Sequence, residues 1–577
     1  MTFTNCRHLI WPPLRLLLLA ALACLTGCTA AHYRKSADKE SYRILSEKEA
    51  RTLGKTNQFS IDTRYSKRDP NEIKKDEIIQ DRLKAEKLKL SLSDALKLAI
   101  ENSRAYQFRK ESLYLSALTL TRDRYDFQPH FFGSLSGKRS RTSSADQTGE
   151  AHGDAGVDQM LKSGARLGLD IANDLFRYFT GDPRRTAVTT ISANLVQPLL
   201  RGAGARIAAE NLTQSERNVI YEIRSFSRYQ NTFALDTISS YYRILQQRDV
   251  VRNEYNNYQS LVLVRDRAEA LAEAGTLSQI QVDQARQDEL SAKNRYILGV
   301  QNYQAQLDQF KNTLGLPMGT ELGLDDSALA ELTTLGLLPA AASEGESYEV
   351  AVQRRLDLLN EIDRFEDSQR KIYVAANQLK ADFNLVADAS LKSKGPTDYA
   401  HFNFNDVSAS AGLQLNLPVD RLRERNSYRA SLISFERQLR SLAQTLDDVR
   451  EDVRRGQRNL QQARQSYQIQ KNAVELATRR VDSAKLSLDA GRVQIRDLLE
   501  AQNAQVQARN ALTQTLVDYH LARLRLLIDI GVVDTGEDRF WLKAHAVGKA
   551  GEVPTPPVPE APPSDEVIPP DKLFGKE

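Results

Sequence analysis

The segment Gly275-Thr276-Leu277-Ser278-Gln279-Ile280-Gln281-Val282-Asp283-Gln284-Ala285 recurs in altered form at residues 491–501, which read Gly-Arg-Val-Gln-Ile-Arg-Asp-Leu-Leu-Glu-Ala. A long stretch with almost no helix breaker precedes each glycine: residues 206–274 contain no glycine or proline, and residues 420–490 contain only Gly456. As continuous helix, each stretch would span about 100 Å. The glycines permit the backbone to leave the helix with positive φ. The sequence therefore predicts two long helical hairpins with coiled-coil-like packing, returning over residues 277–314 and 493–530.

In other segments of the chain, the spacing of apolar residues changes from the 3.6 residues of a helix to the 2 residues of a strand. Every odd-numbered position of residues 407–417 is apolar, and the even positions carry Ser, Gly, Gln or Asn. Shorter runs of the same kind occupy residues 167–171, 191–195 and 383–391. A membrane barrel with lipid outside and water inside requires this alternation, and so does a soluble sheet with one buried face. The strands alone leave both alternatives open.

Each half of the chain has the same order of elements: helix, strands, long helix, glycine turn, helix. We place the halves at residues 91–316 and 347–531, with a linker at 317–346. Pro198 and Pro418 mark the two turns from strand to long helix. Residues 91–127 are expected to form one amphipathic helix with Ser93 as its N-cap. Residues 28–90 are polar and predict a tether with short helices, and the proline-rich residues 532–577 predict an extended tail.

The composition excludes several classes of protein. The chain has 577 residues, 41% hydrophobic and 27% charged, with a net charge of +4 and a mean hydropathy of -0.49. These values exclude a bundle of transmembrane helices and a disordered chain, and the near-neutral charge gives no support to nucleic-acid binding. The seven histidines are dispersed without metal-ligand spacing, and no Gly-x-Ser-x-Gly motif occurs. We therefore expect neither an enzyme nor a metal or cofactor site.

The N-terminus predicts export. Basic residues precede the apolar run 16–25, which is too short to span a bilayer and is typical of a secretory signal, placed at residues 1–27. The run ends Leu25-Thr26-Gly27-Cys28, which resembles the lipobox of bacterial lipoproteins. That resemblance implies lipid on Cys28, and Thr29, where many retained lipoproteins have Asp, favours the outer membrane. An ordinary signal peptide with a chance cysteine is the alternative.

From residue 91 to about 535 the chain resembles the TolC family of outer membrane efflux proteins. The resemblance rests on the duplicated order of elements, on Gln197-Pro198-Leu199-Leu200-Arg201-Gly202, and on the two glycine turns followed by Ala285 and Ala501. It implies an α+β membrane protein: a homotrimer in which each protomer gives four strands to a twelve-stranded outer membrane β-barrel. The barrel is continued by a periplasmic α-helical coiled-coil barrel, whose tip meets a periplasmic adaptor protein of an inner-membrane transporter. From the residues alone, exposed sheet edges already require the chain to close a barrel with copies of itself.

The first half departs from this pattern. Residues 129–198 form a much longer strand region than the equivalent residues 382–418. The excess includes the expected turn Lys162-Ser163-Gly164 and the 167–171 strand. We expect an additional hairpin or a long extracellular loop, and a barrel of more than twelve strands if these strands enter its wall.

The resemblance also implies roles for residues near the glycine turns. Gly275, Thr276, Leu277, Gly491, Arg492 and Val493 are the expected tip turns and adaptor contacts. Asp497 and Glu500 match the acidic ring that narrows family channels and would favour cations. The alternative is structural: acidic residues complement a helix dipole, and Arg492 and Arg496 are close enough to pair with them.

The sequence supports two hypotheses. The first is a passive export channel, the exit duct of a tripartite efflux pump or type I secretion system. The second is a non-pore periplasmic coiled-coil adaptor or scaffolding lipoprotein. Strands with alternating polarity between helices, present twice, favour the channel. The sequence does not specify a transported substrate.

Overall fold

The computed structural model describes residues 29–56, 59–141, 147–179, 185–338, 343–536 and 539–543. The predicted signal peptide, Cys28 and the proline-rich end of the tail lie outside the described residues. The chain divides into two compact units. The sheet unit contains residues up to 68, 107–227 and 360–443, and the helical unit contains residues 69–106, 228–359 and 444 onward. Helices α5 (Arg104–Tyr125), α7 (Glu210–Glu273), α11 (Leu356–Gln378) and α12 (Leu422–Asp489) contribute residues to both.

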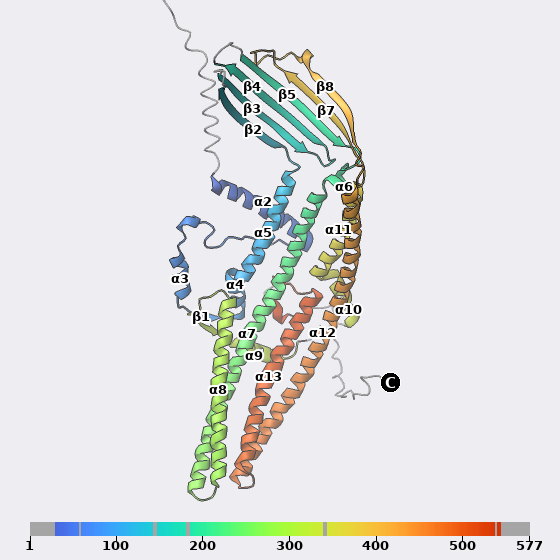
Figure 1. Ribbon diagram of the computed structural model, residues 1–577. Helices are drawn as coiled ribbons and strands as arrows, with labels where there is room; N and C mark the ends of the chain where they lie inside the picture. Colours follow the sequence, from blue (N-terminus) through green and yellow to red (C-terminus); the bar gives the residue numbers. More distant parts are fainter. Residues whose placement is uncertain are drawn as a thin grey trace, which may run out of the picture. The chain divides into compact units, whose positions relative to one another are not determined.

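The sheet unit is built around six antiparallel strands in the order β2-β3-β4-β5-β7-β8 (Figure 1). Their bounds are β2 His130–Arg141, β3 Gln147–Met160, β4 Arg166–Tyr178, β5 Arg185–Pro198, β7 Asp382–Lys392 and β8 Ser408–Asn416. The first half contributes four of them and the second half two. The additional hairpin expected in the first half is thus confirmed as β3–β4. The sheet of one protomer thus has six strands rather than the four that the resemblance implied, because β3 and β4 pair along their length within the same sheet.

The register gives the sheet one apolar and one polar face. Ile171 pairs with Ile191, and Ile191 with Leu391, so these side chains share a face. Their neighbours Asp170 and Ser192 pair with each other on the opposite face. The alternation expected from the sequence is confirmed in β4, β5, β7 and β8. A strand's side-chain period of 2 fixes this arrangement, because a slip of one residue would exchange the two faces.

Residues 28–90, expected as a tether, contain more structure than predicted: α2 Ala30–Leu53, η1 Pro70–Glu72, α3 Lys75–Leu83 and β1 Lys87–Leu90. Helix α2 packs within the sheet unit, where Ile44 and Leu45 are almost fully buried. The hydroxyl of Tyr114 in α5 donates to the Asp38 carboxylate at 2.7 Å. Lys48 pairs with Glu216 of α7.

A buried carboxylate connects α7 and α11 within the sheet unit. Asp367 accepts hydrogen bonds from Tyr221 at 2.6 Å, Arg370 at 2.7 Å and Gln214 at 2.9 Å. Burial alone would raise the pKa of Asp367, but these donors and the charge of Arg217 outweigh it and hold the pKa below its usual value. The charged carboxylate is therefore the form that the fold stabilises.

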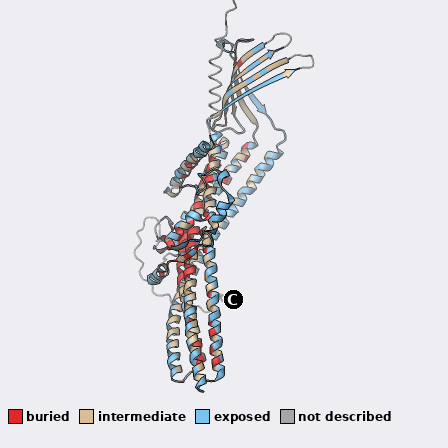
Figure 2. Ribbon diagram, turned by 90° about the vertical axis from the view of Figure 1, so that its left-hand side faces the viewer, coloured by how far each residue is buried: buried red, intermediate tan, exposed pale blue. Residues whose placement is uncertain are grey.

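In the helical unit, α7 returns as α8 (Gln279–Thr313) and α12 returns as α13 (Ile495–Ile530) (Figure 1). Both hairpins predicted from the sequence are thus present. Among the described helices, none combines the length and the apolar character that crossing a membrane would need. Buried residues gather where short elements pack on α7 and α13, and they become sparse toward the hairpin ends (Figure 2).

The expected linker 317–346 contains two elements, β6 Glu321–Leu324 and α9 Ser327–Leu335, and α10 (Glu344–Arg354) begins within it. Strand β6 pairs in parallel with β1, which lies far away in the sequence. The hydroxyl of Tyr241 in α7 donates to the Leu90 carbonyl at 3.0 Å, and the Asp325 amide donates to that hydroxyl at 3.1 Å. One buried tyrosine therefore ties both strands to the long helix.

The single helix expected at 91–127 is two helices. Helix α4 (Leu92–Asn102) ends where Ser103 adopts an extended conformation, and α5 follows. The N-cap is Ser91, whose hydroxyl accepts from the Asp94 amide at 3.2 Å, so the expectation of Ser93 is wrong. Strand β1 ends at Leu90, which leaves Ser91 as the residue between strand and helix.

His520 predicts a pH-dependent stability. Its Nε2 donates to the Gly336 carbonyl at 3.0 Å, while Nδ1 is buried with no partner in the described part of the chain. Burial and the nearby Arg523 lower the pKa of His520 to about 4. An unfolded histidine has a pKa of about 6.5, so the folded state loses stability as the pH falls from 6.5 to 4, by about 3 kcal/mol.

Thermal unfolding at pH 8, 6.5, 5 and 4 tests this expectation, with His520→Gln as the comparison. The parent should lose more stability than the variant between pH 6.5 and 4. Equal losses in the two proteins would show that His520 contributes nothing.

Candidate functional site

The two hairpin turns have the same backbone geometry. After α7, the Gly275 amide donates to Ala272 at 2.9 Å and the Thr276 amide to Leu271 at 2.9 Å. After α12, the Gly491 amide donates to Leu488 at 3.0 Å and the Arg492 amide to Ser487 at 2.9 Å. Each pair of bonds is a Schellman motif, which satisfies carbonyls that a helix end leaves without partners. The sequence repeat therefore corresponds to a structural repeat.

Backbone conformation, not space, requires glycine at both turns. Gly275 has φ +73° and Gly491 has φ +71°, in the left-handed region. A Cβ added at either position would meet no atom within 4 Å. Other residues except Asn and Asp adopt this conformation at a cost of about 1–2 kcal/mol.

Asp497 belongs to the N-terminal cap of α13. The Gln494 amide donates to the Asp497 carboxylate at 3.1 Å, and a capping box joins the two residues. The α8 N-cap, Ser278, makes no such side-chain bond. Asp497 thus has the structural role considered as an alternative, while its side chain remains exposed.

Glu500 lies one turn further along α13, on the same side as Asp497. It accepts from Arg496 Nε at 2.9 Å and lies 3.7 Å from an Arg480 guanidinium nitrogen of α12. Its side chain is 50% exposed. The anticipated pairing with Arg496 is therefore present, and two cations already offset the charge of Glu500 within one protomer.

The two hairpins are joined near their ends by a small apolar cluster. Residues Leu261 and Ala268 of α7, Val282, Ala285 and Ala292 of α8, and Ile495 and Leu499 of α13 form its buried part. Ala285 is the alanine that the sequence repeat singled out, and it is fully buried. Arg267 of α7 pairs with Asp489 of α12 at 2.6 Å. Helix α13 therefore packs against the first hairpin and not only against α12.

Exposure differs among the predicted contact residues. Thr276 and Arg492 are exposed, whereas Leu277 and Val493 are half-buried and Leu277 packs against the apolar cluster. The Thr276 hydroxyl donates to the Leu271 carbonyl at 2.8 Å. Sequence reasoning missed Ile280, one turn beyond the first glycine, whose side chain is 78% exposed. An isoleucine at helical spacing gave no sign that it would lie outside the core.

The remaining predicted site residues lie elsewhere. Pro198 is the last residue of β5 and pairs with Asn384. Pro418 lies between β8 and α12, and its carbonyl accepts from Arg421 Nε at 3.1 Å. Cys28 lies outside the described residues. In the described ranges, no group of three His, Cys, Asp or Glu side chains is arranged to hold a metal ion.

This fold is found in solved outer membrane channels. The CmeC outer membrane channel of Campylobacter jejuni is 14% identical, with a TM-score of 0.56 over 76% of this chain and 85% of that chain. The outer membrane protein VceC of Vibrio cholerae is 13% identical, with a TM-score of 0.55 over 76% and 96%. The MtrE outer membrane channel of Neisseria gonorrhoeae, in its open state, is 11% identical, with a TM-score of 0.55 over 76% and 88%. The chain therefore has the fold of this class of channels.

Residues 347–531 match the family model described as outer membrane efflux protein. This span coincides with the second half of the sequence repeat. The expected resemblance to the TolC family is therefore supported over residues 347–531 by this match, and over 76% of the chain by the fold. Among curated proteins, none is similar enough to count as a relative.

The two turns predict the effect of replacing their glycines. Gly275→Ala and Gly491→Ala should each cost about 1–2 kcal/mol in the local hairpin end, because alanine disfavours positive φ. The Asn variants should cost less. Hydrogen exchange of the Thr276 and Arg492 amides checks this, with about a tenfold loss of protection for each 1.4 kcal/mol.

Gly345→Ala in α10 is the matched control, since that glycine lacks a positive φ and a Cβ would meet no neighbour there. It should leave the hairpin amides unchanged. Alanine variants as protected as the parent at both turns would contradict the assigned geometry.

Proposed function

We propose that the protein is an outer membrane channel that serves as the passive exit duct of a tripartite efflux pump or type I secretion system. The observation that carries the proposal is the six-stranded sheet with one apolar face, one polar face and two unpaired edges. The outer membrane efflux protein domain at 347–531 supports it. A non-pore scaffold would have no use for such a sheet, so the alternative is not favoured.

The apolar face is suited to lipid. Its members include Phe131, Leu135, Leu169, Ile171 and Leu413, whose side chains are between 46% and 86% exposed in one protomer. Lipid-facing strands of outer membrane barrels show this pattern, with polar residues turned toward the lumen. In this proposal the sheet lies in the outer membrane and the long helices extend into the periplasm.

We further propose a homotrimer, as the resemblance implies. Exposed apolar side chains lie on α8 and α12 at equal distances from the two turn glycines. On α8, Ile280, Leu290 and Ile297 lie 5, 15 and 22 residues after Gly275; on α12, Leu486, Leu476 and Ile469 lie 5, 15 and 22 residues before Gly491. All six are more than half exposed. The matched spacing supports packing of α8 from one copy against α12 of the next.

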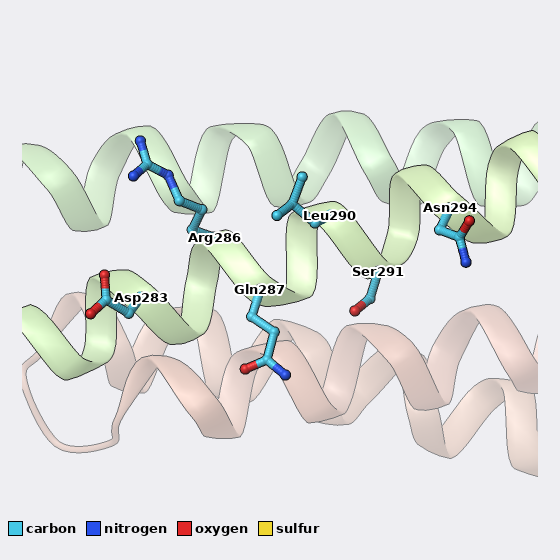
Figure 3. Close-up of a pocket in the computed structure, with 6 residues that line it drawn as sticks. All are labelled: Asp283, Arg286, Gln287, Leu290, Ser291 and Asn294. Carbon is cyan, nitrogen blue, oxygen red and sulfur yellow. The ribbon is translucent and has the colours of Figure 1, made fainter.

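The surface of α8 fits this partner. A hollow of about 490 Å³ is lined by residues of α8 alone, namely Asp283, Arg286, Gln287, Leu290, Ser291 and Asn294 (Figure 3). Arg286 and Leu290 point to one side of the helix, and Gln287 and Ser291 point to the other. A hollow whose walls come from one helix is an open groove, which suits a second helix better than a small ligand.

We assign the contact with a periplasmic adaptor to the hairpin ends. Thr276 and Arg492 are exposed there, and the exposed Ile280 adds an apolar contact one turn away. Leu277 and Val493 contribute through their exposed parts. An inner-membrane transporter would supply the energy, and acyl chains on Cys28 would add a lipid anchor to the barrel. The channel itself requires no cofactor.

We also propose that Asp497 and Glu500 line the constriction of the assembled channel. They lie three residues apart in the first turns of α13, and residues at this spacing share a helix face. Rings of carboxylates at a narrow point favour cations. Because Arg496 and Arg480 offset Glu500 whereas Asp497 contacts a backbone amide, Asp497 carries most of the effect.

Single-channel recording tests the constriction. In planar bilayers, Asp497→Asn should weaken the block by a trivalent cation more strongly than Glu500→Gln does, and the double variant should differ little from Asp497→Asn. Glu475→Gln, an exposed α12 residue paired with Arg479, is the control. A double variant that is blocked like the parent would refute the assignment, and a folded trimer that never conducts would refute the open pore.

Cysteine cross-linking tests the helix packing between copies. Residues after Cys28 include no cysteine, so a Leu290→Cys, Leu476→Cys variant has one engineered pair. Oxidation should join neighbouring copies into covalent dimers and trimers on denaturing gels. Leu290→Cys with Ile469→Cys is the control, because seven residues displace the second thiol by about 10 Å along α12. Equal cross-linking by the two pairs, or no cross-linking by either pair, would contradict the packing of α8 against α12 of the next copy.

A further inference from the structure

We infer that the hairpin β3–β4 is part of the membrane wall, and that three copies close an eighteen-stranded barrel in which β8 of each copy pairs with β2 of the next. The inference rests on the proposed trimeric channel. It departs from the twelve strands that the resemblance implied, because β3 and β4 are inserted between β2 and β5.

The first observation is an unbroken ladder on both sides of the hairpin. Strand β3 pairs with β2 from Asp158 opposite His130 to Gln147 opposite Arg141. Strand β4 pairs with β5 from Arg166 opposite Val196 to Arg177 opposite Arg185. The inserted strands are therefore as long as their neighbours. A flap outside the membrane would have no need to match the full length of the wall.

The second observation is that the apolar face continues across the insertion. Leu167, Leu169 and Ile171 of β4 share the face of Ile191 in β5, and small residues such as Ala151 and Ala155 of β3 extend it toward β2. Leu169 and Ile171 are about half exposed in the protomer. Two polar residues of β4 share this face, Asn173 and Arg177, and each pairs with a polar residue of β5. Asn173 donates a hydrogen bond to its partner Thr189 at 2.8 Å, and Arg177 lies near the strand end away from the helices. Exposure of these apolar side chains to water is energetically unfavourable, whereas a strand that faces lipid requires them.

The third observation is that the opposite face of the insertion is charged. His152 of β3 contacts the Asp174 carboxylate of β4 at 2.6 Å, and Ser134 of β2 donates to Asp154. Asp158 and Asp170 lie on the same face. In hydrocarbon these carboxylates would be strongly unfavourable, but facing a water-filled lumen they remain hydrated.

The turn of the hairpin is fixed at the end of the sheet where the helices begin. Gly164 has φ +91°, and a Cβ there would lie 2.6 Å from the Gly202 carbonyl oxygen. The Gly204 amide donates to the Ser163 carbonyl at 2.9 Å, and Ser163 Oγ donates to Gln197 at 3.3 Å. The expected turn Lys162-Ser163-Gly164 thus packs against the segment that follows β5, as a short turn on the helix side of the wall.

Insertion of two strands preserves the closure of a ring. Because the number of inserted strands is even, β5 has the same direction as in a sheet without β3 and β4, and it runs toward α6 (Ala205–Ala208). The even number also leaves β2 and β8 antiparallel to each other at the two edges, so each edge fits the opposite edge of another copy. Because barrel diameter grows roughly linearly with strand number, eighteen strands give a lumen about 1.5 times as wide as twelve.

Cysteine labelling of the full chain in lipid nanodiscs tests the inference. Leu169→Cys and Asp170→Cys probe the two faces of the inserted β4. Ala409→Cys and Ser408→Cys are their controls in β8, on the same ladder rows through β5 and β7. A membrane-impermeant maleimide should modify the two outward cysteines at least about tenfold more slowly than the two inward ones, because hydrocarbon excludes the reagent.

The outcomes separate the inference from the proposed function. If Leu169→Cys reacts as fast as Asp170→Cys while Ala409→Cys stays protected, the hairpin lies outside the wall and the inference fails alone. If both outward cysteines react rapidly, the sheet is not in lipid and the proposed channel fails. A second variant set joins Ser136→Cys in β2 with single cysteines along β8. Cross-linked dimers are expected for one register, and their absence from every register would overturn the pairing of β8 with β2.

Discussion

Unpaired backbone amides at the two edges of the sheet constrain the whole molecule. Strands β2 and β8 each have a partner on one side only. In hydrocarbon, every amide or carbonyl without a partner costs several kcal/mol, since no water is present to replace it. A single copy with a lipid-facing apolar face and two open edges is therefore not a stable membrane species. In the proposed channel, closure with other copies would satisfy the edges and enclose the polar face, and the result would be a pore.

The helical unit also has surfaces that a single copy leaves uncovered, but these are apolar side chains rather than backbone amides. Its hairpin ends have few buried residues, so each protomer leaves apolar side chains of α8 and α12 in contact with water. A neighbouring copy would cover them. The Schellman turns at Gly275 and Gly491 satisfy the helix ends without a tertiary partner, which lets both hairpins end in water. Charge at these ends is largely paired, as Glu500 with its two arginines and Arg267 with Asp489 show.

Local patterns predicted much of this architecture. The hairpins followed from glycine placement, and four strands followed from alternation, because both signals are local. Strand β3 was harder to predict, since Gly149, Gly153 and Gly156 weaken its apolar pattern. The parallel pair β1–β6 was missed because its partners are distant in sequence and each strand is short. The N-cap was placed at Ser93 rather than Ser91 because the end of β1 at Leu90 was not recognised. At the site, Asp497 and Glu500 follow from their position after a glycine, and Arg496 follows from its spacing of four residues before Glu500. The second partner of Glu500, Arg480, depends on the packing of α12 against α13, which no local pattern displays.

Native mass spectrometry of the full chain released from lipid nanodiscs tests the central claim most directly, because it counts the copies that close one sheet. The account predicts a single species of three chains on release from the nanodiscs, and backbone amides of β2 and β8 that are protected from hydrogen exchange in the bilayer. A folded monomer that stays in the bilayer with freely exchanging edge amides would contradict it.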